Sequence, residues 1–216
     1  MIYSPASACR VVVAPKKWHP KMSFFDRFWK RLFDIVLSFL GLVILWPVIL
    51  VTNVIARSDT QATGFFYQQR VGRHGRLFNV VKLRTMRVEA GTNITTKDDV
   101  RITRSGAFFR RWKLDELPQL WNVLKGEMSF VGPRPDVPGY LDKLSGKNKL
   151  LLELRPGITG PASLKYRDEE TILAQVDDPE TYNDEVIWPD KVAINMEYYQ
   201  NWSLKADLMY ILKTLR

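Results

Sequence analysis

Two adjacent carboxylates stand in the segment DELPQL, at Asp115 and Glu116. Asp115 is a good helix N-cap, and Pro118 is tolerated in a first helical turn because the amides there have no intrahelical partner. Helix capping therefore explains the segment without any chemistry. The same end of a helix is also where exposed amides and the helix dipole favour a phosphate. The segment alone leaves open whether it is a helix start or a reaction centre.

Several cations could bind a phosphate near these carboxylates. Arg134 lies between two prolines in GPRP, which restrict the backbone, and its planar guanidinium can bind two phosphate oxygens. Lys82 and Arg84 alternate on one face of an expected strand, about 7 Å apart, a spacing that suits a diphosphate. Arg110 and Arg111 precede the carboxylates by about one helical turn, and one of them could hold a leaving phosphate. Taken singly, each cation is more commonly a solvated surface charge.

Carboxylates and cations must carry any catalysis in this chain. Its only histidines are His19 and His74, which gives no Cys/His zinc spacing and no His-based triad. The single cysteine, Cys9, excludes an intrachain disulfide framework and fits a reducing compartment. A diphosphate beside Asp115 and Glu116 would need its charge neutralised, and hard carboxylate oxygens suit Mg²⁺. We therefore expect Mg²⁺ as the cofactor.

The composition indicates one folded domain with anionic partners. The chain has 216 residues, 46% of them hydrophobic, and a formal net charge of +9. Such a length and apolar content are enough for a core. The positive charge favours nucleic acid, acidic lipid or phosphorylated metabolites as partners.

A long apolar run upstream indicates a membrane segment. No ionisable residue occurs from Ile35 to Ala56, which is about 22 residues or roughly 33 Å of helix against a hydrocarbon core of about 30 Å. Pro47 interrupts the run and is expected to kink or break a helix. Cations flank both ends, with Lys30 before the run and Arg57 after it, so neither end is favoured to cross. We expect a re-entrant helix-break-helix, with a single kinked transmembrane helix as the alternative.

The remaining pattern predicts an α+β fold in three parts. Residues 1–22 are a basic N-terminal extension, residues 23–57 the re-entrant membrane helix, and residues 58–216 a mostly helical domain with a small β-hairpin. The hairpin is expected from residues 65–70 and 77–85. Helical periodicity follows over residues 105–125, with Gly126 as its stop, and two closing helices are expected over residues 191–200 and 204–215.

Four blocks of this sequence resemble the bacterial sugar transferase family, the monotopic phosphoglycosyl transferases, in their minimal catalytic-domain form. The blocks are VGRHGRLFNVVKLRTM, LDELPQLWNVLKGEMSFVGPRP, LRPGITGPAS and NWSLKADLMYILKTL. With the apolar segment upstream, the resemblance runs from about Phe25 to the C-terminus. The block from DELPQL to GPRP is highly specific.

The resemblance implies transfer of a sugar 1-phosphate from a UDP-sugar to undecaprenyl (polyprenyl) phosphate, with release of UMP. This reaction initiates membrane glycan assembly, for example of exopolysaccharide, O-antigen, capsule or glycoprotein glycan, on the cytoplasmic face of the bacterial inner membrane. Asp115 would form a phosphosugar-aspartyl intermediate and Glu116 would bind Mg²⁺. Lys82, Arg110 and Arg134 match family positions that handle phosphate, whereas Arg84 rests on the strand pattern alone.

The family's membrane element is a re-entrant helix broken at a proline, which favours that topology for the segment around Pro47. Two positions depart from the family pattern. Trp46 stands where relatives often have Ser before the proline, and PASLKYRDEE, from Pro161, replaces a segment that in many relatives contains Ala-Gln and Gly-Arg. The second departure leaves the sugar undefined.

Two other classes compete with an enzyme. A basic nucleic-acid-binding protein would explain the charge but not the apolar run or the carboxylates beside cations, so we expect no nucleic-acid partner. A membrane-anchored scaffold without activity is the stronger alternative, although Asp115, Glu116 and Arg134 together argue against it. A homodimer is compatible with the sequence.

Overall fold

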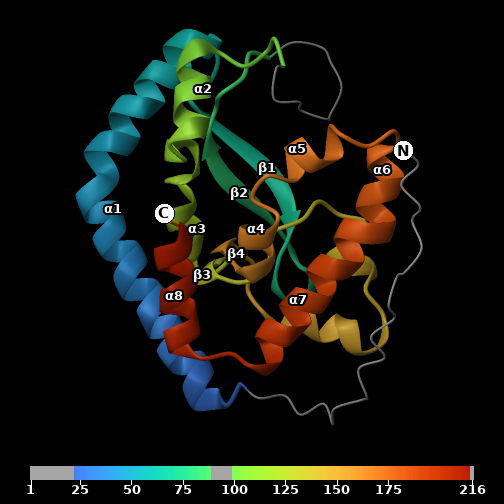
Figure 1. The fold of residues 1–216 in the computed structure, drawn as a ribbon. Coiled ribbons are helices and arrows are strands. Elements are labelled where there is room, and N and C mark those ends of the chain that lie inside the picture. The colour runs from blue at the N-terminus through green and yellow to red at the C-terminus, as the bar shows by residue number, and fades with distance from the viewer. Residues whose placement is uncertain (1–21, 89–98, 215–216) are drawn as a thin grey trace.

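The computed structural model describes residues 22–88 and 99–214, in which helices surround two small sheets (Figure 1). Helix α1 runs along one side of the molecule beside α2 and α3, and α7 lies on the opposite side, with β3, β4 and α4 between them (Figure 1). The helices are α1 Phe24–Thr60, α2 Arg104–Arg111, α3 Gln119–Lys125, α4 Pro161–Lys165, α5 Glu169–Leu173, α6 Pro179–Tyr182, α7 Trp188–Gln200 and α8 Leu204–Thr214. The strands are β1 Phe65–Val71, β2 Leu77–Leu83, β3 Ser129–Val131 and β4 Gly157–Thr159. The mixed fold that the sequence predicts is confirmed, and of the predicted basic extension only Met22 lies within the described residues.

Helix α1 continues through Pro47 without the break that the sequence predicts. It begins at a capping box, in which Ser23 accepts from the Asp26 amide, and ends at Gln61 in the left-handed conformation (φ 53°). A proline removes one helical hydrogen bond at a cost of about 3 kcal/mol. Contacts on both sides of Pro47 hold the helix together here, because α1 packs against α2, α3, β1, β2 and β3.

The polar and apolar faces of α1 are reversed relative to a helix of a soluble protein. Its buried positions are mostly polar, namely Lys30, Asp34, Ser38, Thr52, Ala56 and Thr60. Only 11% of its most apolar 18-residue window is buried. Within the described residues, α1 is the one helix that is long and apolar enough to cross a membrane. The polar stripe faces the protein, and the apolar surface is left for another apolar environment.

The predicted hairpin is confirmed. Strands β1 and β2 pair antiparallel, with Phe66 opposite Lys82 and Arg70 opposite Phe78. The second strand ends at Leu83, two residues earlier than expected, so Arg84 lies just outside it.

The helical pattern before Gly126 forms two helices rather than one. Helix α2 ends near Lys113, which adopts a left-handed conformation (φ 55°), and a 3-10 turn from Leu114 to Glu116 precedes α3. Gly126 (φ 88°) ends α3, as predicted. The helical periodicity predicted over residues 105–125 is interrupted because the left-handed Lys113 redirects the chain before the carboxylates.

A second sheet, of β3 and β4 in parallel, was not predicted. Its strands approach so closely that a Cβ at Gly132 would lie 2.3 Å from the Arg155 carbonyl oxygen. A Cβ at Gly157 would lie 2.2 Å from the Gly132 nitrogen. Only glycine permits this contact, which sets the loop containing Arg134 against the segment after Arg155.

The largest hydrophobic core lies behind this loop. Val131 at the end of β3 packs in one cluster with Leu151 and with Val192, Met196 and Tyr199 of α7. Helices α7 and α8 occupy the two predicted C-terminal helical segments within about three residues at each end. The core therefore supports the loop that carries Arg134.

Candidate active site

Asp115 does not cap a helix. It lies inside the 3-10 turn, and α3 begins at Gln119 after Pro118, without a side-chain cap. Asp115 is only 9% exposed, and its Oδ1 has no hydrogen-bond partner among the described residues. Because a buried polar atom normally has a partner, this unpaired oxygen is available to a ligand.

The charge of Asp115 is incompletely compensated. Burial raises the pKa of its carboxyl, and the adjacent Glu116 raises it further. The cations Lys82, Lys113 and Arg110 act in the opposite direction but do not reverse the shift. A carboxylate with a raised pKa and a free oxygen is a common feature of reactive sites.

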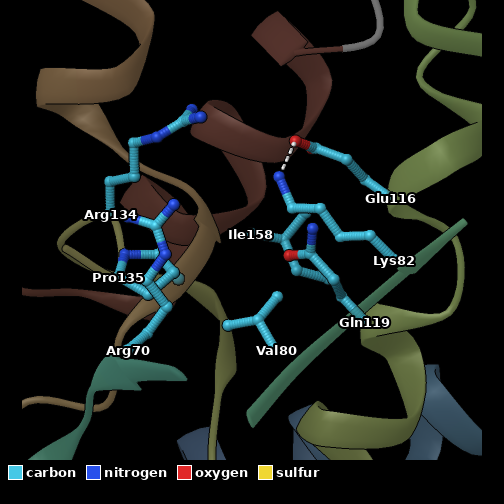
Figure 2. Close-up of a pocket in the computed structure, with 9 residues that line it drawn as sticks. Arg70, Val80, Lys82, Glu116, Gln119, Arg134, Pro135 and Ile158 are labelled. Carbon is cyan, nitrogen blue, oxygen red and sulfur yellow. Dashed lines mark hydrogen bonds and ion pairs between the residues drawn. The ribbon is translucent and has the colours of Figure 1, made fainter. Parts of the chain in front are cut away.

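Glu116 is held in its ionised form. Burial is the largest single influence and would raise the pKa of its carboxyl, but the charges of Lys82, Arg134 and Lys113 together lower it. Its Oε1 lies 3.4 Å from Nζ of Lys82, the contact drawn as a dashed line in Figure 2. The two neighbouring carboxylates therefore experience opposite electrostatic environments.

A pocket with an empty volume of about 320 Å³ lies beside these groups. Figure 2 shows Arg70 and Arg134 on one side and Lys82, Glu116 and Gln119 on the other. The pKa of Arg70 is lowered by burial and then by the positive charge of Arg134. Three cations around one carboxylate form a binding site for an anion with several charges, such as a diphosphate.

Asn122 holds α3 against β2 and so fixes Glu116 opposite Lys82. Its Oδ1 accepts from the Val81 amide at 3.0 Å, and its Nδ2 donates to the Asn79 carbonyl at 2.8 Å. The side chain is fully buried at 1% exposure. A strand-to-helix bond of this kind keeps the two halves of the site in register.

Two predicted residues are not brought into the pocket. Arg84 donates through Nε to the Thr63 carbonyl at 2.8 Å and lies 5.4 Å from the ring centre of Phe66. Arg110 donates through Nε to Thr85 Oγ1 at 2.9 Å. Neither side chain is among those that line the pocket, although Arg110 acts electrostatically on Asp115. Their phosphate-binding roles stay predictions.

Arg70 and Gln119 both line the pocket but were not predicted as site residues from the sequence. A signal existed for each. Directly opposed residues of an antiparallel pair share one face, and Arg70 opposes Phe78, which precedes Val80 and Lys82 on the same face. Gln119 follows Glu116 by three residues, a spacing that places side chains together on a helical turn.

The carboxylates fit a magnesium ion. Within residues 22–88 and 99–214, no group of three or more His, Cys, Asp or Glu side chains could hold a metal. Mg²⁺ needs only one or two protein carboxylates, because waters and substrate phosphates supply its other ligands. Ionised Glu116 meets that requirement with one carboxylate.

Comparison with known proteins identifies the family. A family model described as bacterial sugar transferase matches residues 25–216. The uncharacterized sugar transferase EpsL of Bacillus subtilis (strain 168) is 36% identical over 188 residues, which cover 87% of this chain and 85% of EpsL. The exopolysaccharide production protein ExoY of Sinorhizobium fredii (strain NBRC 101917 / NGR234) is 33% identical over 205 residues, which cover 86% of this chain and 83% of ExoY.

A longer relative is also similar. The UDP-glucose:undecaprenyl-phosphate glucose-1-phosphate transferase of Xanthomonas campestris pv. campestris is 37% identical over 193 residues, which cover 86% of this chain but only 37% of that protein. The family match includes Asp115, Glu116 and the cations of the pocket. This chain therefore belongs to the bacterial sugar transferase family, the phosphoglycosyl transferases that its motifs resemble.

Proposed function

We propose that this protein transfers a sugar 1-phosphate from a UDP-sugar to undecaprenyl phosphate and releases UMP. The observation that carries the proposal is the buried, unpaired oxygen of Asp115. The adjacent Glu116 lines a pocket together with Arg70, Lys82 and Arg134. The name of the Xanthomonas relative supports both the donor and the lipid acceptor. A putative undecaprenyl-phosphate N-acetylgalactosaminyl 1-phosphate transferase of Bacillus subtilis, 43% identical over 121 residues, supports the same reaction class.

The reaction proceeds in two displacements at phosphorus. In the first, a carboxylate oxygen of Asp115 attacks the sugar-bearing phosphorus, and the bond from that phosphorus to the bridging oxygen breaks, so UMP leaves with the electron pair. In the second, a phosphate oxygen of undecaprenyl phosphate attacks the same phosphorus and restores the Asp115 carboxylate. Because of the covalent intermediate, the soluble donor and the lipid acceptor react in two separate displacements instead of in one step that needs both.

The pocket cations orient the diphosphate and offset its charge. Arg134 and Arg70 face Lys82 across the pocket, so a diphosphate between them meets cations on both sides (Figure 2). Glu116 would hold Mg²⁺, which when bound neutralises charge on the diphosphate. Arg110 is the further candidate for the leaving phosphate, and Arg84 would extend the basic surface.

Helix α1 anchors the enzyme in the bacterial inner membrane as a monotopic, re-entrant element, with the catalytic domain on the cytoplasmic face. Support comes from its contacts with one and the same domain: Lys30 bonds to Asp207 near one end, and Ala56 is buried with Leu83 and Phe109 near the other. Near its middle, a Cβ at Gly41 would lie 3.1 Å from Leu120. A helix held at both ends by one domain does not carry its ends to opposite sides of a bilayer.

Exposed aromatic side chains of the neighbouring helices extend this apolar surface. Phe108 on α2, Trp112 directly after α2 and Trp121 on α3 are each more than half exposed. Tryptophan is enriched at membrane interfaces because its ring is apolar and its N–H is polar. The membrane-facing surface therefore includes α2 and α3 beside α1.

Cysteine accessibility tests this topology. Cys9 is the only cysteine and precedes α1, and Ser58 is exposed near its other end, so Ser58→Cys in a Cys9→Ser background reports the second side. Both thiols should resist an impermeant maleimide on intact cells and react after permeabilisation. Labelling of one of the two thiols from outside would mean that α1 spans the membrane.

A donor screen tests the reaction. The full chain in detergent is incubated with undecaprenyl phosphate and a set of UDP-sugars that includes N-acetylated deoxysugars, and UMP is measured. At least one UDP-sugar should release UMP, and repeated turnover should require undecaprenyl phosphate. No UMP from any donor would support the alternative of an inactive membrane-anchored scaffold. A product with undecaprenyl diphosphate linkage would place the protein at the start of membrane glycan assembly, and the name of the relative ExoY, an exopolysaccharide production protein, supports a role in making such a glycan.

A further inference from the structure

A second hollow lies at the N-terminal end of α1 and shares no lining residue with the catalytic pocket. It is open to solvent and has an empty volume of about 970 Å³. Four arginines line it, Arg27, Arg31, Arg73 and Arg155, together with the rings of Phe24 and Phe28. We refer to this hollow as the arginine pocket.

The arginine pocket carries uncompensated positive charge. Glu153, the one acidic residue in its lining, is shared by Arg27 at 3.1 Å and the Tyr199 hydroxyl at 3.0 Å. The pKa of Arg73 is lowered by burial and then by the charges of Arg155 and Arg27. Residues 1–21, which precede this end of α1, contain no Asp or Glu. The pocket therefore holds more cations than its own carboxylate can balance.

Two of the arginines are held in place but keep donors free. Arg73 donates through Nε to the Glu153 carbonyl at 2.8 Å, and Arg155 donates through Nε to the Gly126 carbonyl at 2.8 Å. The terminal nitrogens of both guanidiniums have no acceptor among the described residues. Arg31, in contrast, donates both terminal nitrogens to carbonyls at the end of α3. Anchored guanidiniums with free terminal nitrogens match the geometry of a phosphate group.

The apolar part of the lining distinguishes a lipid from a soluble anion. Phe24 is 87% exposed and Phe28 is 53% exposed, and both belong to the first turns of the helix with the outward apolar face. Aromatic side chains beside cations are typical of the depth at which lipid phosphates lie. We propose that the arginine pocket binds the phosphate headgroup of an anionic membrane lipid, with Arg73 and Arg155 on the phosphate and the acyl or prenyl chain along Phe24 and Phe28.

Lipid binding by variants tests this site without any sugar donor, so the test does not depend on the proposed reaction. The full chain in detergent is titrated with phosphatidylglycerol in one arm and undecaprenyl phosphate in the other, and bound lipid is counted by native mass spectrometry. Arg73→Gln and Arg155→Gln should each weaken binding about ten-fold, the effect of losing one charge-assisted contact. Arg76→Gln is the matched control, because Arg76 is exposed in the same hairpin and does not line the pocket. It should bind within about two-fold of the parent.

The two arms identify the source of the phosphate, because only the lipid that occupies the pocket will show the loss in Arg73→Gln. Equal binding of both lipids by the parent, Arg73→Gln and Arg76→Gln would overturn the proposal. Competition by inorganic phosphate at the same concentration as the lipid would also overturn it, since the site would then bind a soluble anion. If the Arg73→Gln protein does not fold, Arg73→Lys is tested instead, because lysine keeps the positive charge but lacks the planar guanidinium. Weaker lipid binding by Arg73→Lys than by the parent would support the proposal, and equal binding would overturn it. A protein that passes this test and releases no UMP would refute the proposed reaction alone.

Discussion

Two pairs of lysine and carboxylate in this molecule differ in how far their hydrogen-bonding capacity is used. Nζ of Lys30 lies 2.6 Å from Asp207 and also donates to the Val131 carbonyl at 3.0 Å and to the Tyr198 hydroxyl at 3.2 Å. Asp207 in turn accepts from Tyr198 at 2.7 Å and from Trp202 Nε1 at 3.0 Å, and it is 1% exposed. Lys82 and Glu116, by comparison, are 3.4 Å apart and partly exposed at 24% and 19%.

This is the difference expected between a structural pair and a pair that binds a ligand. All donors of the Lys30 ammonium are used, so the pair ties α1 to the end of β3 and to α8. Lys82 has one long contact with Glu116 and no other hydrogen bond among the described residues, so both side chains can exchange that contact for a ligand. The residue types are the same in both places, and burial and the number of partners decide the role.

The largest effect on stability is expected from Lys30→Met. The substitution leaves Asp207 buried without its cation, which destabilises a protein by about 3–5 kcal/mol. Unfolding of the detergent-solubilised protein, followed by circular dichroism during heating, measures the change.

The paired variant Lys30→Met with Asp207→Leu sharpens this result. Removing both charges should recover part of the lost stability, because no ion then stays buried alone. A single variant as stable as the parent would contradict the structural role of the Lys30 network.

Arg134→Lys should reduce UMP release about 100-fold and leave the unfolding temperature unchanged. A point ammonium cannot replace a planar fork on two phosphate oxygens, and one such interaction contributes about 2–4 kcal/mol to a transition state. Arg134 is exposed, so the fold does not depend on it. Activity within a few-fold of the parent would remove Arg134 from the phosphate site.

Lys82→Met is the direct counterpart of Lys30→Met. The Lys82 pair is partly exposed, and such pairs contribute about 0–1 kcal/mol, so stability should change by no more than that. UMP release should fall about ten-fold or more, since one cation of the pocket is lost. If Lys82→Met were as destabilising as Lys30→Met, the distinction between the two pairs would be wrong.

Glu116→Gln should give the smallest of these effects, a several-fold increase in the Mg²⁺ concentration needed for half-maximal UMP release. The amide keeps the size of the side chain but removes a charged ligand, which weakens binding of a hard cation. Titration with Mg²⁺ after treatment with EDTA measures the shift, and an unchanged Mg²⁺ requirement would place the ion elsewhere.

Local signals in the sequence were sufficient for the hairpin, for Gly126 as a helix stop and for the C-terminal helices. They also identified Asp115, Glu116, Lys82 and Arg134 as one group, of which all but Asp115 line the pocket. Lys30 was interpreted as a cation flanking the membrane, yet its partner Asp207 lies 177 residues away. No local pattern can indicate a contact at that separation.

The other differences have the same origin in tertiary structure. Helix α1 passes through Pro47 because the domain supports it on both sides. Aspartate is a residue type that favours the N-cap position, but the left-handed Lys113 places Asp115 in a turn that precedes α3. Strands β3 and β4 have three residues each, which is too short for a periodic signal. They also lie far apart in the sequence, so no local pattern indicates their pairing.

The central claim is that the unpaired carboxylate of Asp115 forms a covalent bond to phosphorus. Intact-protein mass spectrometry after rapid mixing with the active UDP-sugar alone, without undecaprenyl phosphate, tests it most directly. We expect an added mass of one phosphosugar that maps to Asp115 and disappears when the lipid is added, and we expect no adduct in Asp115→Asn. If no adduct forms under rapid quench, and if UMP release requires donor and lipid to be bound together, the double displacement is wrong and Asp115 does not act as the nucleophile.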